Sequence, residues 1–210
     1  LILKCRKRKL IILAGLNLVL MAIEAWFGSI VVASNLVPWT ITVHMLLALV
    51  IIAIQIYFIR LISPVHSVKI LQPKWMLVLI WICFIITFYQ MFLGTQVRES
   101  IDELTKMGYG REAWTDKLGM PFYIHRSFSW LVLVLIVFIT WKNEQTQRLI
   151  PIRAAFVILS LELLSGVLLA YADMPGLVQT SHLIFATILF GILTMLIFRS
   201  RTATHVTLKV

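Results

Sequence analysis

Charged side chains are scarce in this sequence: Asp, Glu, Lys and Arg supply 13% of its 210 residues, whereas hydrophobic residues supply 60%. This composition excludes a water-soluble globular protein and places the chain in lipid. Cysteine is also rare, and Cys5 and Cys83 form no C-x-x-C pair, which excludes a disulfide or zinc framework. The apolar runs lack the alternation of a transmembrane β-barrel, so helices must satisfy the backbone polar groups inside a bilayer.

Six apolar runs of about 20 residues follow one another along the chain, and each is long enough to cross a hydrocarbon core of about 30 Å. They span 10–34, 39–60, 74–97, 122–141, 151–171 and 178–199. The sequence therefore predicts an all-α membrane protein in which six transmembrane helices are visible.

The net charge of +10 is distributed unevenly between the two sides of these helices. Of the 19 Lys and Arg residues, 14 fall on one side, which the positive-inside rule makes cytoplasmic. These residues are Lys4, Arg6, Lys7, Arg8, Lys9, Arg60, Lys69, Lys74, Lys142, Arg148, Arg153, Arg199, Arg201 and Lys209. Both visible termini are then cytoplasmic, and the basicity does not require a nucleic-acid partner.

An internal repeat appears when the chain is compared with itself at an offset of 138 positions. The shared pattern is E-x3-G-x15-H. Its matched pairs are Glu24 and Glu162, Gly28 and Gly166, Thr42 and Thr180, His44 and His182, and Ala48 and Ala186. Glu and His are rare inside membranes, so this match favours duplication of a helical unit.

The repeat predicts how the chain is organised. Residues 67–210 form one complete four-helix bundle. Its first helix, which is the third of the chain, ends at Gly94–Ser100 and is followed by a long outer loop, 95–124. Residues 1–66 form the second half of an N-terminal bundle. We expect the matching first half, about 65 residues, upstream of Leu1, which gives eight helices in the intact protein.

Three histidines, His44, His125 and His182, lie near the outer ends of helices that run from outside to inside. Histidines on facing helices of a bundle can hold a heme iron through two axial imidazoles. The alternative is that each is an interfacial residue that only forms hydrogen bonds. His66 and His205 are expected at the cytoplasmic surface.

Glu24 and Glu162 lie inside the predicted helices, four residues before the repeated glycines. A buried carboxyl group is costly unless it is protonated or paired. Each could relay protons or orient a ligand imidazole. Each could equally be a protonated group bonded to a neighbouring helix, and the sequence leaves this choice open.

The segments GTQVRES and YIHRSFSW, together with the repeated E-x3-G-x15-H pattern, resemble the heme A synthase family of cytochrome oxidase assembly. The resemblance covers nearly the whole chain as the last six of eight helices. It implies that His125 and His182 ligate a heme b cofactor, and that His44 is one of the two ligands of a substrate heme O. The partner of His44, and a carboxylate beside that partner, would lie outside this chain. The catalytic residue is thus unknown, with Glu24 as a candidate.

The same resemblance implies that one porphyrin methyl group is oxidised to a formyl group and that an electron acceptor takes the electrons. Arg98 and Arg126 would bind the heme propionates; for Arg98 the alternatives are membrane anchoring or pairing with Glu99 or Asp102. Expected partners are the lipid bilayer and a heme O synthase that delivers substrate, and the expected location is a bacterial inner membrane with heme sites near the outer face. Some family members carry a cysteine pair in each long outer loop, which segment 95–124 lacks.

Three other functions are compatible with these features. A bis-histidine cytochrome b that only transfers electrons needs the same histidines. A structural or assembly subunit could keep the repeat without binding heme. A transporter built from repeats is disfavoured, because the repeat is parallel and no helix is interrupted by Gly or Pro in mid-span.

Overall fold

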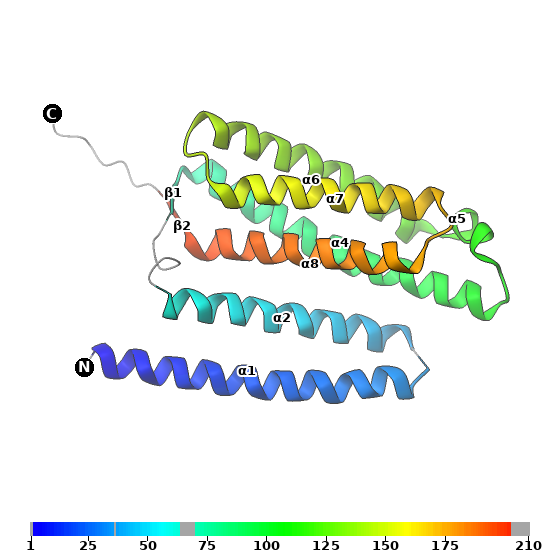
Figure 1. Ribbon diagram of the computed structural model, residues 1–210, viewed down its shortest axis with the longest axis horizontal. Helices are drawn as coiled ribbons and strands as arrows, with labels where there is room; N and C mark the ends of the chain where they lie inside the picture. Colours follow the sequence, from blue (N-terminus) through cyan, green and yellow to red (C-terminus); the bar gives the residue numbers. More distant parts are fainter. Residues whose placement is uncertain (1, 36, 64–69, 203–210) are drawn as a thin grey trace. The chain divides into compact units, whose positions relative to one another are not determined.

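The computed structural model describes residues 2–35, 37–63 and 70–202 (Figure 1). Six of its helices are long and apolar enough to cross a membrane, which confirms the predicted all-α membrane protein. They are α1 (Ile2–Ala33), α2 (Pro38–Ile62), α4 (Lys74–Lys106), α6 (Met120–Gln145), α7 (Ile150–Tyr171) and α8 (Gly176–Arg199). His66, His205 and the side chain of Cys5 fall outside the described part of the chain.

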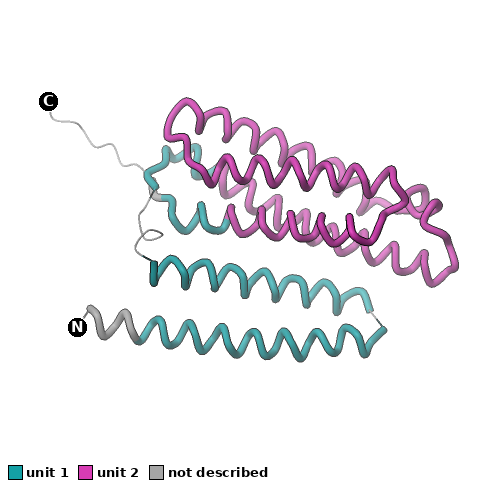
Figure 2. The backbone as a smooth tube through the Cα atoms, in the orientation of Figure 1, with its two compact units in different colours: residues 1–78, 194–210 teal, residues 79–193 magenta. Residues whose placement is uncertain are grey.

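The chain divides into two compact units (Figure 2). Unit 1 comprises residues 1–78 and 194–210, and within it α1 and α2 form an antiparallel hairpin (Figure 1). Unit 2 comprises residues 79–193 and contains a bundle of α4, α6, α7 and α8. The predicted assignment of 1–66 and 67–210 to two duplicated bundles stays a prediction.

The core of unit 2 is built from aliphatic and aromatic side chains of all four helices. Ile80 of α4, Ile136 of α6 and Leu159 of α7 are each at most 3% exposed. Phe84 of α4 packs on Phe190 of α8, with ring centroids 5.3 Å apart. Such packing fixes the helices against one another, which is what lets side chains from different helices converge on one site.

Helix α4 is longer than the sequence analysis predicted. It continues without interruption to Lys106, so the prediction that Gly94–Ser100 ends the helix and opens a loop over 95–124 is wrong. The helix ends in a Schellman motif: Gly108 has a φ of +83°, Tyr109 N–H donates to the Leu104 carbonyl, and Gly108 N–H donates to Thr105. The connection to α6 is therefore much shorter than predicted.

A small cap closes this end of the bundle. It contains the 3-10 helix η1 (Arg111–Ala113) and the short helix α5 (Trp114–Lys117). Its buried cluster consists of Ile101, Trp114, Leu118 and Met174, with Val97, Leu104, Phe122 and Leu169 packed against it. The Arg111 guanidinium donates to the carbonyl oxygen of Met174 at 2.6 Å, which ties the cap to the α7–α8 turn.

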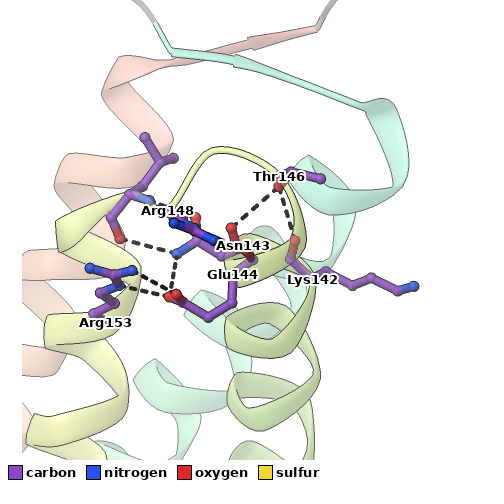
Figure 3. A network of polar contacts seen from close by, with 7 residues as sticks. Lys142, Asn143, Glu144, Thr146, Arg148 and Arg153 are labelled. Atoms are coloured by element: carbon purple, nitrogen blue, oxygen red, sulfur yellow. Dashed lines mark hydrogen bonds and ion pairs between the residues drawn. The ribbon is translucent and has the colours of Figure 1, made fainter.

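At the opposite end of unit 2, Asn143 organises the turn between α6 and α7 (Figure 3). Its side-chain oxygen accepts from the Leu149 N–H at 2.8 Å, and its amide nitrogen donates to the Leu149 carbonyl at 3.2 Å. Asn143 is only 1% exposed. Beside it, Glu144 and Arg153 form a two-pronged ion pair, with bonds of 2.7 and 2.6 Å.

Two short strands, which the sequence analysis did not predict, belong to unit 1. β1 (Ile70–Gln72) precedes α4, and β2 (Ser200–Thr202) follows α8. They pair in parallel, with Ile70 opposite Ser200 and Gln72 opposite Thr202.

Candidate functional site

The three histidines predicted as ligands each lie in the second turn of a long helix: His44 in α2, His125 in α6 and His182 in α8. His125 and His182 face each other inside unit 2. Their ring centroids are 6.3 Å apart and their planes are inclined by 77°. The structure thus brings two of the three predicted ligands together in one bundle.

Gln90 of α4 holds His125 with both its backbone and its side chain. The Nδ1 atom of His125 lies 3.1 Å from the carbonyl oxygen of Gln90. In return, the Gln90 amide donates to the carbonyl oxygen of His125 at 2.8 Å and to the Ser129 hydroxyl at 2.9 Å. Gln90 is 6% exposed, so these bonds form out of contact with solvent.

His182 is held in a similar way by α7. Its Nδ1 atom lies 3.0 Å from the carbonyl oxygen of Glu162 and 2.9 Å from the Ser165 hydroxyl. The Ser165 hydroxyl donates to that same carbonyl at 2.7 Å. Each ring is therefore oriented by a carbonyl group from the neighbouring helix.

These contacts determine which ring nitrogen is available to a ligand. A backbone carbonyl oxygen can only accept, so Nδ1 of His125 and of His182 must carry the proton and donate. In a neutral imidazole the lone pair is then on Nε2. Metal-binding histidines are commonly oriented this way, by a hydrogen bond from the far ring nitrogen. The pair is accordingly suited to bind one metal ion through two Nε2 atoms.

A glycine lies against each of the three rings. A Cβ atom added at Gly28 would come within 3.1 Å of His44 Cε1, and one added at Gly166 within 3.4 Å of His182 Cε1. At Gly94 the corresponding distance to His125 Cε1 is 3.8 Å. The glycines let the imidazoles approach the neighbouring helix closely, most strictly at Gly28.

A cavity of about 350 Å³ lies beside the histidine pair. Its wall is largely apolar and includes Phe122, Leu133, Leu159, Leu163, Val167 and Leu189. Arg126 and Tyr171 also line it, and the Arg126 guanidinium donates to the Tyr171 hydroxyl at 3.3 Å. Arg126 could therefore meet an anionic group of a ligand in this cavity.

Arg98 is placed differently from Arg126. It forms an ion pair with Asp102 at 2.6 Å, one helical turn further along α4, and donates to the Gln179 side chain at 2.7 Å. It is not among the residues that line the cavity. The proposed contact of Arg98 with a propionate stays a prediction, and the contact with Asp102 is the alternative that the sequence analysis gave.

Three residues of the cavity wall carry a buried polar atom that has no hydrogen-bond partner among the described residues. These atoms are Thr87 Oγ1, Gln90 Oε1 and Glu162 Oε2. Buried polar groups are normally paired, and a group without a partner commonly marks a place where water or a ligand binds. The carboxyl group of Glu162 does not reach the His182 ring; only its backbone carbonyl does.

Unit 1 contains the remaining predicted residues, His44 and Glu24. The Nδ1 atom of His44 lies 3.0 Å from a carboxylate oxygen of Glu24. This distance is short enough for an ion pair, but the two groups are not aligned for a hydrogen bond. Both residues line a depression of about 370 Å³ between α1 and α2, together with Met21, Gly28 and Gln55. The His44 side chain is 38% exposed and the Glu24 side chain 16%.

Gln90 is the residue that sequence reasoning missed. It precedes Gly94 by four positions, just as Glu24 precedes Gly28 and Glu162 precedes Gly166. All three motifs place a glycine against the histidine of a following helix. A search for Gln as well as Glu in this pattern would have found it.

The fold and the site together define an integral membrane helical protein that pairs two oriented imidazoles within a bundle. The chain belongs to the COX15-CtaA family of cytochrome oxidase assembly proteins, whose family model matches residues 1–194. No curated protein matches the chain significantly.

Proposed function

We propose that the protein is a heme A synthase, which oxidises one methyl group of heme O to a formyl group and so supplies heme A to cytochrome oxidase. Two observations support this proposal. The chain belongs to a cytochrome oxidase assembly family. Inside unit 2, His125 and His182 face each other with their Nδ1 atoms bonded to carbonyl oxygens, and this arrangement is the observation that carries the proposal.

The spacing of the two rings fits a shared metal ion. Metal–imidazole bonds are about 2 Å long, and a ring nitrogen lies about 1 Å from its ring centre, so two imidazoles on opposite sides of one metal have centroids about 6 Å apart. The measured separation is 6.3 Å. No group of three or more His, Cys, Asp or Glu side chains in the described residues is arranged to hold a metal ion. Two histidines therefore suit an iron whose remaining ligands come from a macrocycle.

The chain's own residues would bind and orient the cofactor in unit 2. His125 and His182 would hold heme b, and the backbone carbonyls of Gln90 and Glu162 keep their rings in the required tautomer. The apolar wall of the cavity excludes water from the macrocycle. Arg126, at the Tyr171 hydroxyl, is placed to pair with a carboxylate, which guanidinium groups bind well. When bound, heme b supplies one-electron redox chemistry.

His44 in unit 1 is the proposed ligand of the substrate, heme O. Conversion of a methyl to a formyl group with water as the source of the oxygen atom releases four electrons and four protons, so an electron acceptor is a necessary partner. Holding the macrocycle through residues on packed helices fixes which methyl group is presented for oxidation. We further propose that a heme O synthase delivers the substrate, that the membrane is a bacterial inner membrane with the visible termini in the cytoplasm, and that the heme sites lie near the opposite face.

The decisive experiment measures the hemes extracted from membranes of cells that lack the gene or carry single variants. We expect deletion to abolish heme A and to accumulate heme O. His125→Ala and His182→Ala should do the same and should remove the low-spin bis-histidine spectrum from the purified protein. Thr187→Ala is a matched control on α8, because the Thr187 hydroxyl donates to the Leu183 carbonyl of its own helix at 2.8 Å.

Two results would contradict the proposal. An unchanged heme profile after deletion would leave an electron-transferring cytochrome b as the better explanation. A wild-type protein purified without heme from heme-replete cells would favour a non-catalytic assembly subunit.

A further inference from the structure

The two copies of the repeat use the same glutamate differently. In unit 2 the Glu162 backbone carbonyl contacts Nδ1 of His182, while one oxygen of its side chain is buried and without a hydrogen-bond partner among the described residues. In unit 1 the side chain of Glu24 lies 3.0 Å from Nδ1 of His44. The repeated glutamates thus stand in equivalent positions but only one of them places its carboxyl group at the imidazole.

The two copies also differ at the position three residues after the glutamate, where one has a serine and the other a phenylalanine. The repeat aligns Ser165 of unit 2 with Phe27 of unit 1. The Ser165 hydroxyl lies 2.9 Å from Nδ1 of His182 and occupies the place beside the ring. Phe27 offers no hydrogen-bonding group and packs edge-on against Trp39, with centroids 6.2 Å apart. Among the described residues, Nδ1 of His44 has no hydrogen-bond partner, and a carboxylate oxygen of Glu24 lies 3.0 Å from it.

We propose that Glu24 is a positioning residue that orients His44 and strengthens it as an electron donor to bound iron, a task that unit 2 assigns to two neutral groups, the Ser165 hydroxyl and the Glu162 carbonyl. The inference rests on the proposed function, because it requires an iron bound at His44. It goes beyond that function by assigning different donor strengths to the two histidine sites.

The physical reason is the charge next to Nδ1. A carboxylate 3.0 Å from Nδ1 places a negative charge beside the ring, which makes the imidazole more basic at Nε2 than a neutral carbonyl does. A more basic ligand stabilises the more oxidised state of the iron that it binds, which lowers the midpoint potential. Iron at His44 should then have a lower midpoint potential than it would with a neutral partner.

The test is a redox titration of the full-length, heme-loaded protein, followed by visible absorption and electron paramagnetic resonance. His44→Ala identifies the spectral component that depends on His44. We expect Glu24→Gln to shift the midpoint potential of this component upwards by at least the equivalent of a tenfold change in equilibrium constant, about 59 mV for one electron. Glu162→Gln, the same substitution at the repeat-equivalent position, should leave this component where it was.

A reciprocal variant tests the role of the serine. Ser165→Ala should change the resonance signature of the His182-dependent component and leave the His44-dependent one unchanged. The inference is overturned if Glu24→Gln leaves the potential of the His44 component unmoved, or if Glu162→Gln moves it equally. If Glu24→Gln removes the His44-dependent component altogether, Glu24→Asp is the deciding variant. Retention of the component in Glu24→Asp supports the role of the carboxylate, and loss of the component in both variants overturns the inference.

The failure of the proposed function would look different. In that case no spectral component would disappear in His44→Ala, or the deletion strain would keep its heme A. The inference on Glu24 would fall with the first of these results. With heme bound at His44 and an unmoved potential in Glu24→Gln, the inference alone would fail.

Discussion

Replacing Asn143 by alanine should destabilise the protein, because this side chain holds the turn between α6 and α7. The substitution removes the acceptor of the Leu149 N–H and the donor to the Leu149 carbonyl. Asn143 is 1% exposed, so water does not replace its amide without rearrangement of the turn. The Leu149 N–H is left without its acceptor, which costs about 1–3 kcal/mol. The Leu149 carbonyl still accepts from the Ile152 and Arg153 N–H groups, at 3.2 and 3.4 Å.

For a chain of this length, 1 kcal/mol shifts the melting temperature by about 2–4 °C, so Asn143→Ala should lower it by about 2–12 °C. The assay is thermal unfolding of the purified protein in detergent, followed by circular dichroism. Asn143→Asp should have a melting temperature between those of the wild type and Asn143→Ala, because it keeps the acceptor for the Leu149 N–H and loses the donor.

Glu144→Gln is the matched control, one residue further along α6. It weakens the ion pair with Arg153, which is exposed to solvent and therefore contributes little to stability. The two substitutions disturb the same turn, which Figure 3 shows, but only Asn143→Ala leaves the Leu149 N–H without its acceptor. A fall in melting temperature for Asn143→Ala no larger than that for Glu144→Gln would refute the reasoning.

Three further predictions concern the sites and the cap. Gly28→Ala should lower heme retention at the unit 1 site more than Gly94→Ala lowers it in unit 2, because the added Cβ would lie 3.1 Å from the His44 ring and 3.8 Å from the His125 ring, respectively. Heme-to-protein ratios determined by absorption measure this difference, and equal losses would contradict the prediction. Arg126→Gln should speed heme transfer to apomyoglobin more than Arg98→Gln does, because only Arg126 lines the cavity. Trp114→Ala, at a cost of about 3–5 kcal/mol, should open the cap to limited proteolysis while the helices stay intact; an unchanged cleavage pattern would show that the cap does not depend on this side chain.

The number of transmembrane helices and their order could be predicted from composition alone, since apolar length determines which segments can span a bilayer. The end of α4 could not be found in this way, because residues beyond Gly94 are polar and were read as a loop. Their pattern nevertheless contains a helical signal. Val97, Ile101 and Leu104 recur at helical spacing and pack on the cap, and Arg98 pairs with Asp102 one turn along.

The candidate ligands could be predicted because His is rare in apolar helices and because the repeat preserves its spacing. The facing of His125 and His182 follows from chain direction and depth, which a sequence supplies. The groups that orient the rings could not be predicted from the sequence, because they are backbone carbonyls of neighbouring helices. Every residue has a backbone carbonyl, so the residue types do not indicate which one contacts a side chain. Gln90 contributes mainly in this way, although its amide also bonds to His125.

The parallel pair of β1 and β2 has a consequence for how the chain matures. β1 precedes the α4–α8 segment and β2 follows it, so the ribosome synthesises β1 before this segment and β2 after it. The ladder between Ile70–Gln72 and Ser200–Thr202 can form only after α8 has been inserted. Until then the backbone groups of β1 have no strand to pair with. The pairing of the two strands therefore depends on completion of the whole α4–α8 segment.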